Sequence, residues 1–365
     1  MKIVIDHQKF TEQKYGGITR YLSCLAFEIN KLNHDIKIVA PLYINKYLTH
    51  LPKKIVTGFH FKFTNSHLTK VLGLSNNFLS QLIIKKYNPD VIHESYYTEH
   101  PTIKSSQPRV ITVHDMIHER FPNEFQNDDT IKLKKKSLAR AEHIIAISNN
   151  TKKDLMEFYN INESKITTIY HGPTSNLIDI NSEIRKTAEF SKPYLLYVGH
   201  RSGYKNFNLL INAIGLSNKL KKNINVIAFG GLPFNKEEIT LISKAGLKSS
   251  QVVHIVGNDN RLKNLYQNAE AFVYPSLYEG FGMPPLEAMS NDCPVISSNT
   301  SSMPEVIGDA AEYFNPESAE DLLKAIKNVI FSNRKNELIN LGSKRVKIFS
   351  WKKCAEETLS VYRRL

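Results

Sequence analysis

The sequence YPSLYEGFGMPPLEAMSNDCP, residues 274–294, carries the strongest signal for both the fold and a ligand site. It places two carboxylates, Glu279 and Glu287, before and after a Gly-Phe-Gly turn and a Pro-Pro step. Glycines allow backbone N–H groups to approach a ligand, and prolines suit the first turn of a helix. The N-terminus of such a helix attracts anions. The segment therefore predicts a site for a diphosphate and for sugar hydroxyls, as in a nucleotide sugar.

Two glutamates at this spacing would mean little alone, because any acidic surface helix supplies them. The whole segment, however, closely resembles the Glu-x7-Glu region of the retaining family 4 glycosyltransferases, which have the two-domain GT-B fold. In that family the first Glu and the backbone amides after it bind the donor sugar, and the second Glu holds the ribose. The matching residues in this chain are Glu279, Gly280, Phe281, Gly282, Met283 and Glu287.

The chain is long enough for two domains, since 365 residues exceed what one core usually supports. Strand-like runs alternate with amphipathic runs, which is typical of α/β proteins with parallel sheets. We expect two Rossmann-like domains facing a cleft, an acceptor-side domain over 1–175 and a nucleotide-sugar-binding domain over 190–350. The aperiodic segment after Pro173 is the expected linker. The resemblance implies that the helical run at 351–365 crosses back to the first domain.

Two glycine-containing segments are candidates for holding the donor diphosphate. Gly16 and Gly17 follow the first strand, and their position matches the N-terminal glycine loop of the family, which contacts the diphosphate. The segment 199–206, GHRSGYKN, resembles the one in which an Arg and a Lys neutralise the leaving group. Arg201 and Lys205 are therefore the expected cations. His200 interrupts the usual Gly-Arg order, and the alternative is that both are solvated surface cations.

The first domain offers His114 at the carboxyl end of a strand. A lone His is usually structural, but ligands of parallel sheets bind beyond the strand ends, and the matching family His touches the donor sugar near the reacting centre. In the second domain, Leu262 matches a Leu that packs beside the nucleobase. The acceptor-side candidates lie in the first domain, after the strand that ends at His114. They are Asp115, His118, Glu119 and Arg120.

The formal charge of +13 is concentrated in part of the first domain. Between Asp35 and Asp90 there are eight lysines and no acidic residue, together with many apolar residues. This combination favours a surface for anionic lipid headgroups, and a solvated lysine-rich face is the alternative. Nucleic acid is not an expected partner, because the segment lacks Arg and no motif for it is present.

The remaining signals concern location and cofactors. The three cysteines lack metal-ligand or redox spacing, the N-terminus does not resemble a signal peptide, and no run of about 18 apolar residues occurs. We expect a cytoplasmic protein, with peripheral attachment to the inner face of the cytoplasmic membrane as an option. The Gly-x-Gly-x-x-Gly, Walker and Asp-x-Asp motifs are absent from the expected positions. We therefore expect no cofactor and no metal.

Together these features favour a retaining hexosyltransferase that uses GDP-mannose or a UDP-hexose. Its acceptor would be a glycan or a polyprenol-linked sugar in polysaccharide or O-antigen biosynthesis. Two alternatives remain open at this point. One is a nucleotide-sugar 2-epimerase of the same fold, and the other is a noncatalytic nucleotide-binding scaffold.

Overall fold

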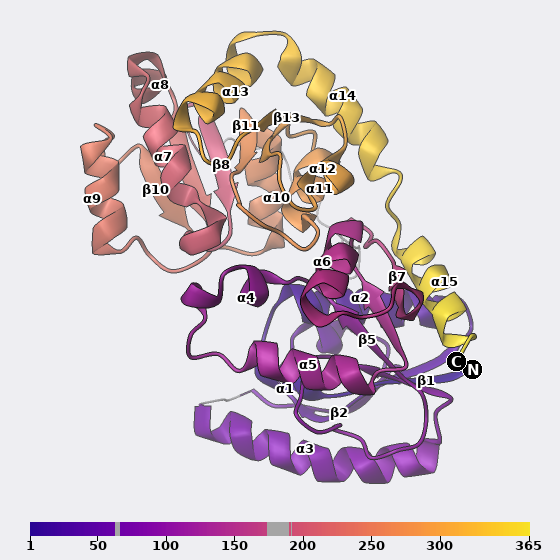
Figure 1. The fold of residues 1–365 in the computed structure, drawn as a ribbon. Helices are drawn as coiled ribbons and strands as arrows, with labels where there is room; N and C mark the ends of the chain where they lie inside the picture. The colour runs from indigo at the N-terminus through magenta and orange to yellow at the C-terminus, as the bar shows by residue number, and fades with distance from the viewer. Residues whose placement is uncertain (63–65, 174–189, 191) are drawn as a thin grey trace. The chain divides into compact units, whose positions relative to one another are not determined.

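A computed structural model describes residues 1–62, 66–173, 190 and 192–365, apart from the side chains of 66–72 and 74. The described chain divides into two compact units, both of them α/β (Figure 1). Unit 1 comprises residues 1–180 together with 349–365, and unit 2 comprises residues 181–348. The linker expected after Pro173 falls on 174–189, outside the described residues.

Unit 1 contains a seven-stranded sheet in the order β3-β2-β1-β4-β5-β6-β7. Every neighbouring pair is parallel. The strands are β1 Lys2–Ile5, β2 Asp35–Tyr43, β3 Val56–His60, β4 Val91–Glu94, β5 Arg109–Val113, β6 His143–Ala146 and β7 Ile166–Thr168. The chain proceeds from β1 to β2 and β3 on one side and then to β4 on the other. Such a reversal leaves a crevice at the carboxyl ends of the two diverging strands, here β1 and β4.

The helices of unit 1 include the last helix of the chain. They are α1 Gln8–Glu12, α2 Gly17–Lys31, α3 Ser66–Tyr87, α4 Ile117–Arg120, α5 Thr130–Arg140, α6 Asn149–Tyr159 and α15 Trp351–Tyr362, with 3-10 turns η1 Tyr47–His50, η2 Pro122–Glu124 and η3 Glu163–Lys165. In Figure 1, α15 lies beside α2, and α3 runs along β2. Leu25 of α2 and Leu359 of α15 are buried in one core with Ile5 of β1. Each such side chain contributes about 1.5–3 kcal/mol by burial, which explains why α15 belongs to unit 1.

Unit 2 contains a six-stranded parallel sheet in the order β10-β9-β8-β11-β12-β13. The strands are β8 Tyr194–Val198, β9 Asn225–Phe229, β10 Val252–Ile255, β11 Ala271–Tyr274, β12 Val295–Ser298 and β13 Ala311–Phe314. The helices are η4 Gly203–Lys205, α7 Phe207–Gly215, α8 Asn218–Asn223, α9 Lys236–Lys244, α10 Asp259–Asn268, α11 Met283–Ser290, α12 Met303–Ile307, α13 Ala319–Phe331 and α14 Arg334–Val346. Here the strand order reverses between β8 and β11, which places the crevice after these two strands.

The predicted fold class is confirmed by these two Rossmann-like parallel sheets and by the return of the terminal helix to unit 1. The sequence analysis did not anticipate β3, α3 or β13. Within the described part of the chain, no helix combines the length and the apolar character needed to cross a bilayer.

Candidate active site

The loops after β8 and β11 meet at the reversal point of unit 2. Lys205 ends η4 and Glu279 follows β11, and their side chains form an ion pair with Nζ and Oε1 2.6 Å apart. The loops are also joined through the backbone, since the Leu277 N–H donates to the Tyr204 carbonyl at 2.7 Å. The paired side chains are only 19% and 10% exposed. The structure therefore brings together two predicted site residues that lie 74 positions apart.

The loop from Glu279 to the start of α11 is held in place by two serines that follow β12. The Ser302 hydroxyl donates to the carbonyls of Glu279 and Phe281 at 2.8 and 2.9 Å, and the Glu279 N–H donates to Ser301 Oγ at 3.1 Å. Gly282 caps α11 with φ of 115°, a conformation that side chains rarely adopt. The loop is thus preorganised at a helix N-terminus, as binding of a diphosphate or a sugar requires.

The other carboxylate, Glu287, lies on α11. Taken as whole residues, Glu287 and Glu279 are buried to the same extent, at 9% and 8% exposure. Tyr274 at the end of β11 is a neighbour of Glu279 that the sequence analysis missed. Burial and the Glu279 carboxylate raise the pKa of Tyr274 well above its ordinary value. The phenol therefore stays protonated and can donate a hydrogen bond. Its place at a strand end, five residues before Glu279, was the available signal.

Arg201 faces a different part of unit 2. Its Nε lies 2.7 Å from Glu238 Oε1, and its guanidinium donates to the carbonyls of Gly230 and Leu232 and lies 4.7 Å from the centre of the Phe234 ring. Glu238 in turn completes the capping box of α9. The guanidinium thus fixes the segment that leads into α9, whereas Lys205 faces Glu279.

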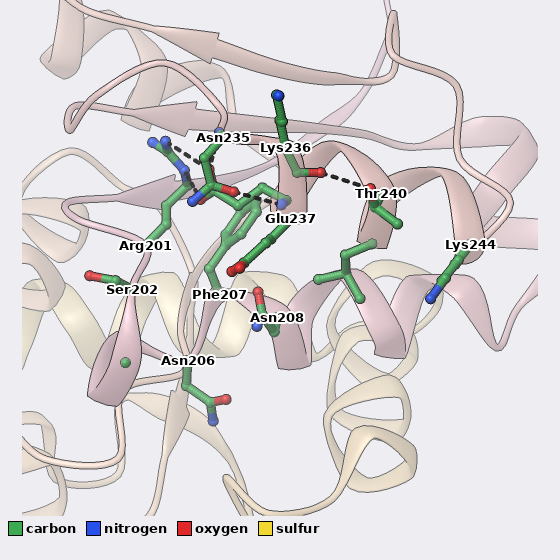
Figure 2. Close-up of a pocket in the computed structure, with 13 residues that line it drawn as sticks. Arg201, Ser202, Asn206, Phe207, Asn208, Asn235, Lys236, Glu237, Thr240 and Lys244 are labelled. Atoms are coloured by element: carbon green, nitrogen blue, oxygen red, sulfur yellow. Dashed lines mark hydrogen bonds and ion pairs between the residues drawn. The ribbon is translucent and has the colours of Figure 1, made fainter. Parts of the chain in front are cut away.

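A cavity of about 620 Å³ lies between residues 201–208 and the start of α9 (Figure 2). Of the described residues that line it, Arg201 is the one predicted site residue, and Lys205 and Glu279 belong to the neighbouring ion pair instead. The site proposed from the sequence therefore centres on the loops after β8 and β11 and not on this cavity. Leu262 is half-buried in the first part of α10, where the Asn258 side chain caps the helix by accepting from the Arg261 N–H at 3.0 Å.

In unit 1, the glycine pair begins the 15-residue helix α2. The backbone of Gly16 is extended, with φ of 177°, so that its conformation does not demand glycine. A Cβ at Gly17 would meet nothing within 4 Å. A Cβ at Gly16, by contrast, would lie 2.3 Å from Gln13 Oε1. Gly17 therefore leaves open space at a helix N-terminus, where amides and the helix dipole favour an anion.

His114 follows β5 and lies against aromatic rings. Its ring centroid is 5.1 Å from that of Tyr21, in an edge-on arrangement, and 6.1 Å from that of His171. Burial lowers the pKa of His114 to about 4, and the cations Lys9 and Lys134 act in the same direction against Asp115. The imidazole is therefore neutral at pH 7 and can contact a sugar hydroxyl only as a hydrogen-bond donor or acceptor.

The residues after His114 form an anchored turn. The Asp115 carboxylate accepts from the Ile117 N–H at 3.1 Å, and His118 lies 3.5 Å from Asp128 and 4.3 Å from the centre of the Phe125 ring. Two other acceptor-side candidates have structural partners. Glu119 pairs with the buried Lys134 at 2.8 Å, and Arg120 pairs with Asp154 and Glu157 on α6.

Two further histidines of unit 1, His93 and His171, are buried. His93 bonds the Tyr362 hydroxyl at 2.5 Å and the Thr112 hydroxyl at 2.9 Å, which links α15 to the sheet. Burial lowers the pKa of His93 to about 3 and that of His171 well below its ordinary value. Both rings therefore stay neutral in the folded protein at a pH where they would be charged in the unfolded chain.

Acidification from pH 7 to pH 5 is expected to destabilise the fold. The unfolded chain binds protons at these histidines below about pH 6.5, while the folded protein does not. The free energy of unfolding is therefore highest above that pH. It decreases as the pH falls, by about 1.4 kcal/mol per pH unit for each ring. Urea unfolding at pH 7, 6 and 5 measures this slope. His93→Asn should reduce it and His100→Asn, at an exposed position, should not. A midpoint independent of pH would contradict the expectation.

Comparison with known proteins connects this geometry to a family. A family model described as glycosyl transferases group 1 matches residues 179–345, and one described as glycosyltransferase family 4 matches residues 15–173. The chain belongs to the family 4 glycosyltransferases. The predicted family is thereby confirmed, and with it the prediction of an enzyme.

Relatives of this family 4 glycosyltransferase include two bacterial proteins. It is 32% identical over 239 residues to the O-antigen chain mannosyltransferase RfbU of Salmonella typhimurium, an alignment that covers 64% of each protein. It is 27% identical over 295 residues to the O-antigen chain mannosyltransferase B of Escherichia coli, which covers 77% of this chain and 76% of that protein. About a third of RfbU thus lies outside the similarity.

The structure of Anabaena Alr3699/HepE in complex with UDP-glucose superposes with a TM-score of 0.71 over 100% of both chains. The sequence identity is 17%, so that this likeness shows the shared fold alone.

Proposed function

We propose that this glycosyltransferase moves a hexose from a nucleotide sugar to a glycan or polyprenol-linked acceptor, with retention at the anomeric carbon, in polysaccharide or O-antigen assembly. The observation that carries the proposal is the pair of Lys205 and Glu279 at the reversal point of the unit 2 sheet. A cation and a carboxylate at this place match the two needs of a nucleotide sugar, a charged diphosphate and a hydroxyl-bearing sugar.

The roles of the residues follow from their chemistry. Lys205 stabilises the charge that develops on the departing diphosphate, and Glu279 accepts hydrogen bonds from the donor sugar. Glu287 holds the ribose hydroxyls, and the amides after Gly16 bind the diphosphate. His114 contributes a neutral imidazole near the reacting sugar. In the absence of donor, the contact between Lys205 and Glu279 keeps both charges compensated in a partly buried site.

The contacts of Arg201 favour a positioning role over direct contact with the diphosphate, since its guanidinium is engaged by Glu238 and two carbonyls. Leu262 remains our proposal for the residue beside the nucleobase, and Asp115 and His118 for the acceptor side.

The first test is a screen of GDP-mannose and UDP-hexoses for thermal stabilisation and for slow hydrolysis. The names of the two relatives support a mannosyl donor, so that GDP-mannose is expected to give the largest shift. A donor at 100 times its Kd adds about 2.7 kcal/mol of stability. Conversion of a UDP-sugar to its 2-epimer without an acceptor would favour the epimerase instead. Binding without hydrolysis or transfer to any acceptor would favour a noncatalytic scaffold.

We also propose that unit 1 associates with anionic lipid. Large apolar side chains are exposed on β3 and α3, including Phe59, Phe78 and Leu82 at 79%, 68% and 57%. Phe78, Leu82 and the exposed Lys85 are spaced by four and three residues, which places them on one face of α3. A helix face that combines aromatic and basic residues suits the headgroup region of a membrane. The side chain of Lys70 lies outside the described residues.

Binding to liposomes of anionic lipid is expected to fall steeply with added salt. Each lysine near the surface contributes about 1 kcal/mol, and this attraction is screened. The triple variant of Lys53, Lys54 and Lys62 to Gln should lose binding at low salt and keep nucleotide binding. The same change at Lys248, Lys324 and Lys327, exposed lysines of unit 2, serves as the control. Cosedimentation measures the liposome binding of both triple variants. Wild-type protein that ignores anionic liposomes at low salt would refute the membrane surface.

A further inference from the structure

The reversal point of the unit 1 sheet carries side chains that the donor site does not use. Strands β1 and β4 are adjacent and parallel, and the chain leaves them in opposite directions. The segments that follow are residues 6–12, which include α1, and residues 95–97. In open parallel sheets, ligands bind in the crevice outside the strands at such a point. In unit 2 the corresponding point holds Lys205 and Glu279.

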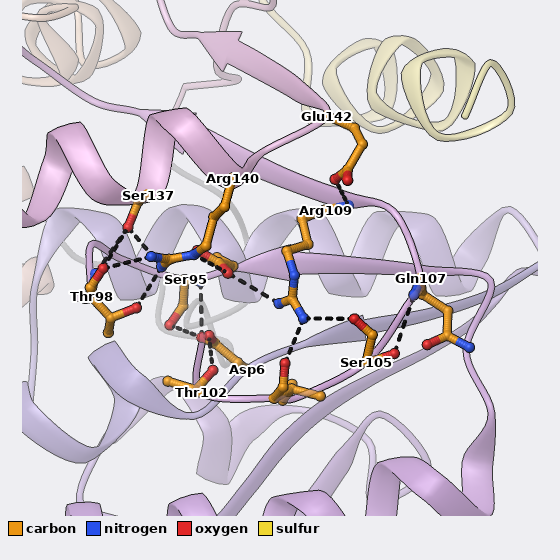
Figure 3. Close-up of polar contacts among 12 residues, drawn as sticks. Asp6, Ser95, Thr98, Thr102, Ser105, Gln107, Arg109, Ser137, Arg140 and Glu142 are labelled. Carbon is orange, nitrogen blue, oxygen red and sulfur yellow. Dashed lines mark hydrogen bonds and ion pairs between the residues drawn. The ribbon is translucent and has the colours of Figure 1, made fainter. Parts of the chain in front are cut away.

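These two segments are joined by a hydrogen-bond network around Asp6 (Figure 3). The buried Asp6 carboxylate accepts from the Ser95 N–H at 2.9 Å, from the Ser95 hydroxyl, and from the Thr102 hydroxyl at 2.7 Å. The Lys9 N–H in turn donates to Ser95 Oγ at 3.2 Å. The start of α1 is therefore fixed to the segment after β4, and the side chains that it presents are held on a rigid support.

The side chains presented there are a cation, a carboxylate and an aromatic ring. Lys9 Nζ lies 3.1 Å from Glu12 Oε2 and 3.4 Å from the centre of the Tyr96 ring. The Lys9 side chain is 11% exposed and that of Glu12 is 46% exposed. Burial raises the pKa of Tyr96, so that its phenol stays protonated, and Lys9 and Glu12 compensate each other's charge. The group is therefore nearly neutral, with an ammonium as donor, a carboxylate as acceptor and a phenol as both.

The same group lies close to the residues after β5. The Tyr96 ring packs against Tyr97, with the ring centroids 4.4 Å apart. Lys134 Nζ lies 5.3 Å from the centre of the Tyr97 ring and donates to the Asp115 carbonyl, next to His114, at 3.0 Å. His114 is the residue that we place near the reacting sugar. A ligand bound by Lys9 and Glu12 would therefore lie beside that position, where an acceptor hydroxyl is needed.

We propose that Lys9, Glu12 and Tyr96 form the subsite that binds the sugar ring of the acceptor. This inference rests on the proposed transfer reaction and adds the residues that hold the acceptor. The expected ligand is an uncharged pyranoside, because a compensated pair offers hydrogen bonds to neighbouring hydroxyls and no net charge for a phosphate. Tyr96 supplies an apolar ring edge for the sugar's carbon face. Neither Lys9 nor Tyr96 was a candidate from the sequence, although both follow strands that end at the crevice.

The chain contains a matched control for this group. On α2, Lys31 Nζ lies 2.8 Å from Glu28 Oε1 and 4.6 Å from the centre of the Phe27 ring. It is the same combination of ammonium, carboxylate and ring, at the opposite end of a helix that begins at the glycine pair. Changes at Lys31 and Glu28 thus reproduce the local loss of charge and contact without touching the crevice.

The experiment compares Lys9→Gln and Glu12→Gln with Lys31→Gln and Glu28→Gln. Saturation-transfer NMR with methyl α-D-mannopyranoside, without donor, gives the pyranoside affinity. Kinetics with the donor from the nucleotide-sugar screen give the KM of the acceptor and of the donor separately. The loss of one charge-assisted hydrogen bond is expected to weaken pyranoside binding and to raise the acceptor KM about tenfold, with the donor KM within about twofold. The control variants are expected to match the wild type.

Glu12→Gln keeps the test valid if Lys9→Gln fails to fold, because Glu12 is the more exposed partner. The proposal is overturned if the acceptor KM is unchanged, if the donor KM rises by the same factor, or if wild-type protein binds none of the methyl mannoside, glucoside, galactoside and rhamnoside. Failure of the proposed transfer reaction gives a different result. Pyranoside binding then still depends on Lys9 and Glu12, but no nucleotide sugar is hydrolysed.

Discussion

Lys205→Ala is expected to lower kcat by about two to three orders of magnitude. The ammonium matters most when the diphosphate begins to leave, and removal of one preorganised donor in a water-poor site costs about 3–4 kcal/mol of transition-state stabilisation. The Lys205 and Glu279 side chains are 19% and 10% exposed, so that little solvent would replace the lost charge. Steady-state kinetics with the hydrolysed donor measures the effect, and urea unfolding separates it from a loss of stability.

A second ion pair in unit 2 provides the control for this change. Lys335 pairs with Glu270 at 2.7 Å, with side chains that are 35% and 29% exposed. Lys335→Ala therefore removes a similar contact away from the proposed site and should leave kcat unchanged. If Lys205→Ala turned over at the wild-type rate, Lys205 would have no part in the mechanism. A loss of kcat in both variants would attribute the effect to stability.

Glu287→Ala is expected to weaken binding of the donor nucleotide by about 10- to 100-fold. The carboxylate is buried on α11, and its loss would leave ribose hydroxyls unpaired, at a cost of about 1–3 kcal/mol. Isothermal titration calorimetry with GDP and UDP measures this directly and requires no acceptor. Glu270→Ala is the matched control, because it removes a carboxylate of the same unit outside the site. Unchanged affinity in Glu287→Ala would exclude the ribose role.

Much of the secondary structure was predictable from local sequence. The strand expected to end at His114 is β5 Arg109–Val113, and the helix expected at the Pro-Pro step is α11, with prolines in its first turn. These elements depend on short-range rules, such as runs of β-branched residues and the fixed φ of proline. Helix α3 was missed because Phe78 and Leu82 are exposed on its outer face, which removes the contrast between an apolar and a polar side.

The candidate site was predictable only in part. The sequence singled out Lys205 and Glu279 as candidates for one site, and the structure brings these two side chains together, but the sequence placed Arg201 with them equally. The structure separates these cations, because Arg201 is drawn to Glu238, which lies 37 residues further along and caps another helix. No local pattern encodes such a partner. Lys9 and Tyr96 were missed for the same reason, since their significance depends on which strand ends are neighbours.

The sequence by itself determined that the chain is α/β, and that a glycine-containing loop after Glu279 leads into a proline-started helix that carries Glu287. These properties arise from interactions within a few residues. The tertiary structure alone decided that Lys205 meets Glu279, that α15 is buried in unit 1, and that Lys9 lies over Tyr96. Each of these contacts joins residues far apart in the chain. They depend on strand order, which is set by burial of whole apolar faces and not by the residues at the site.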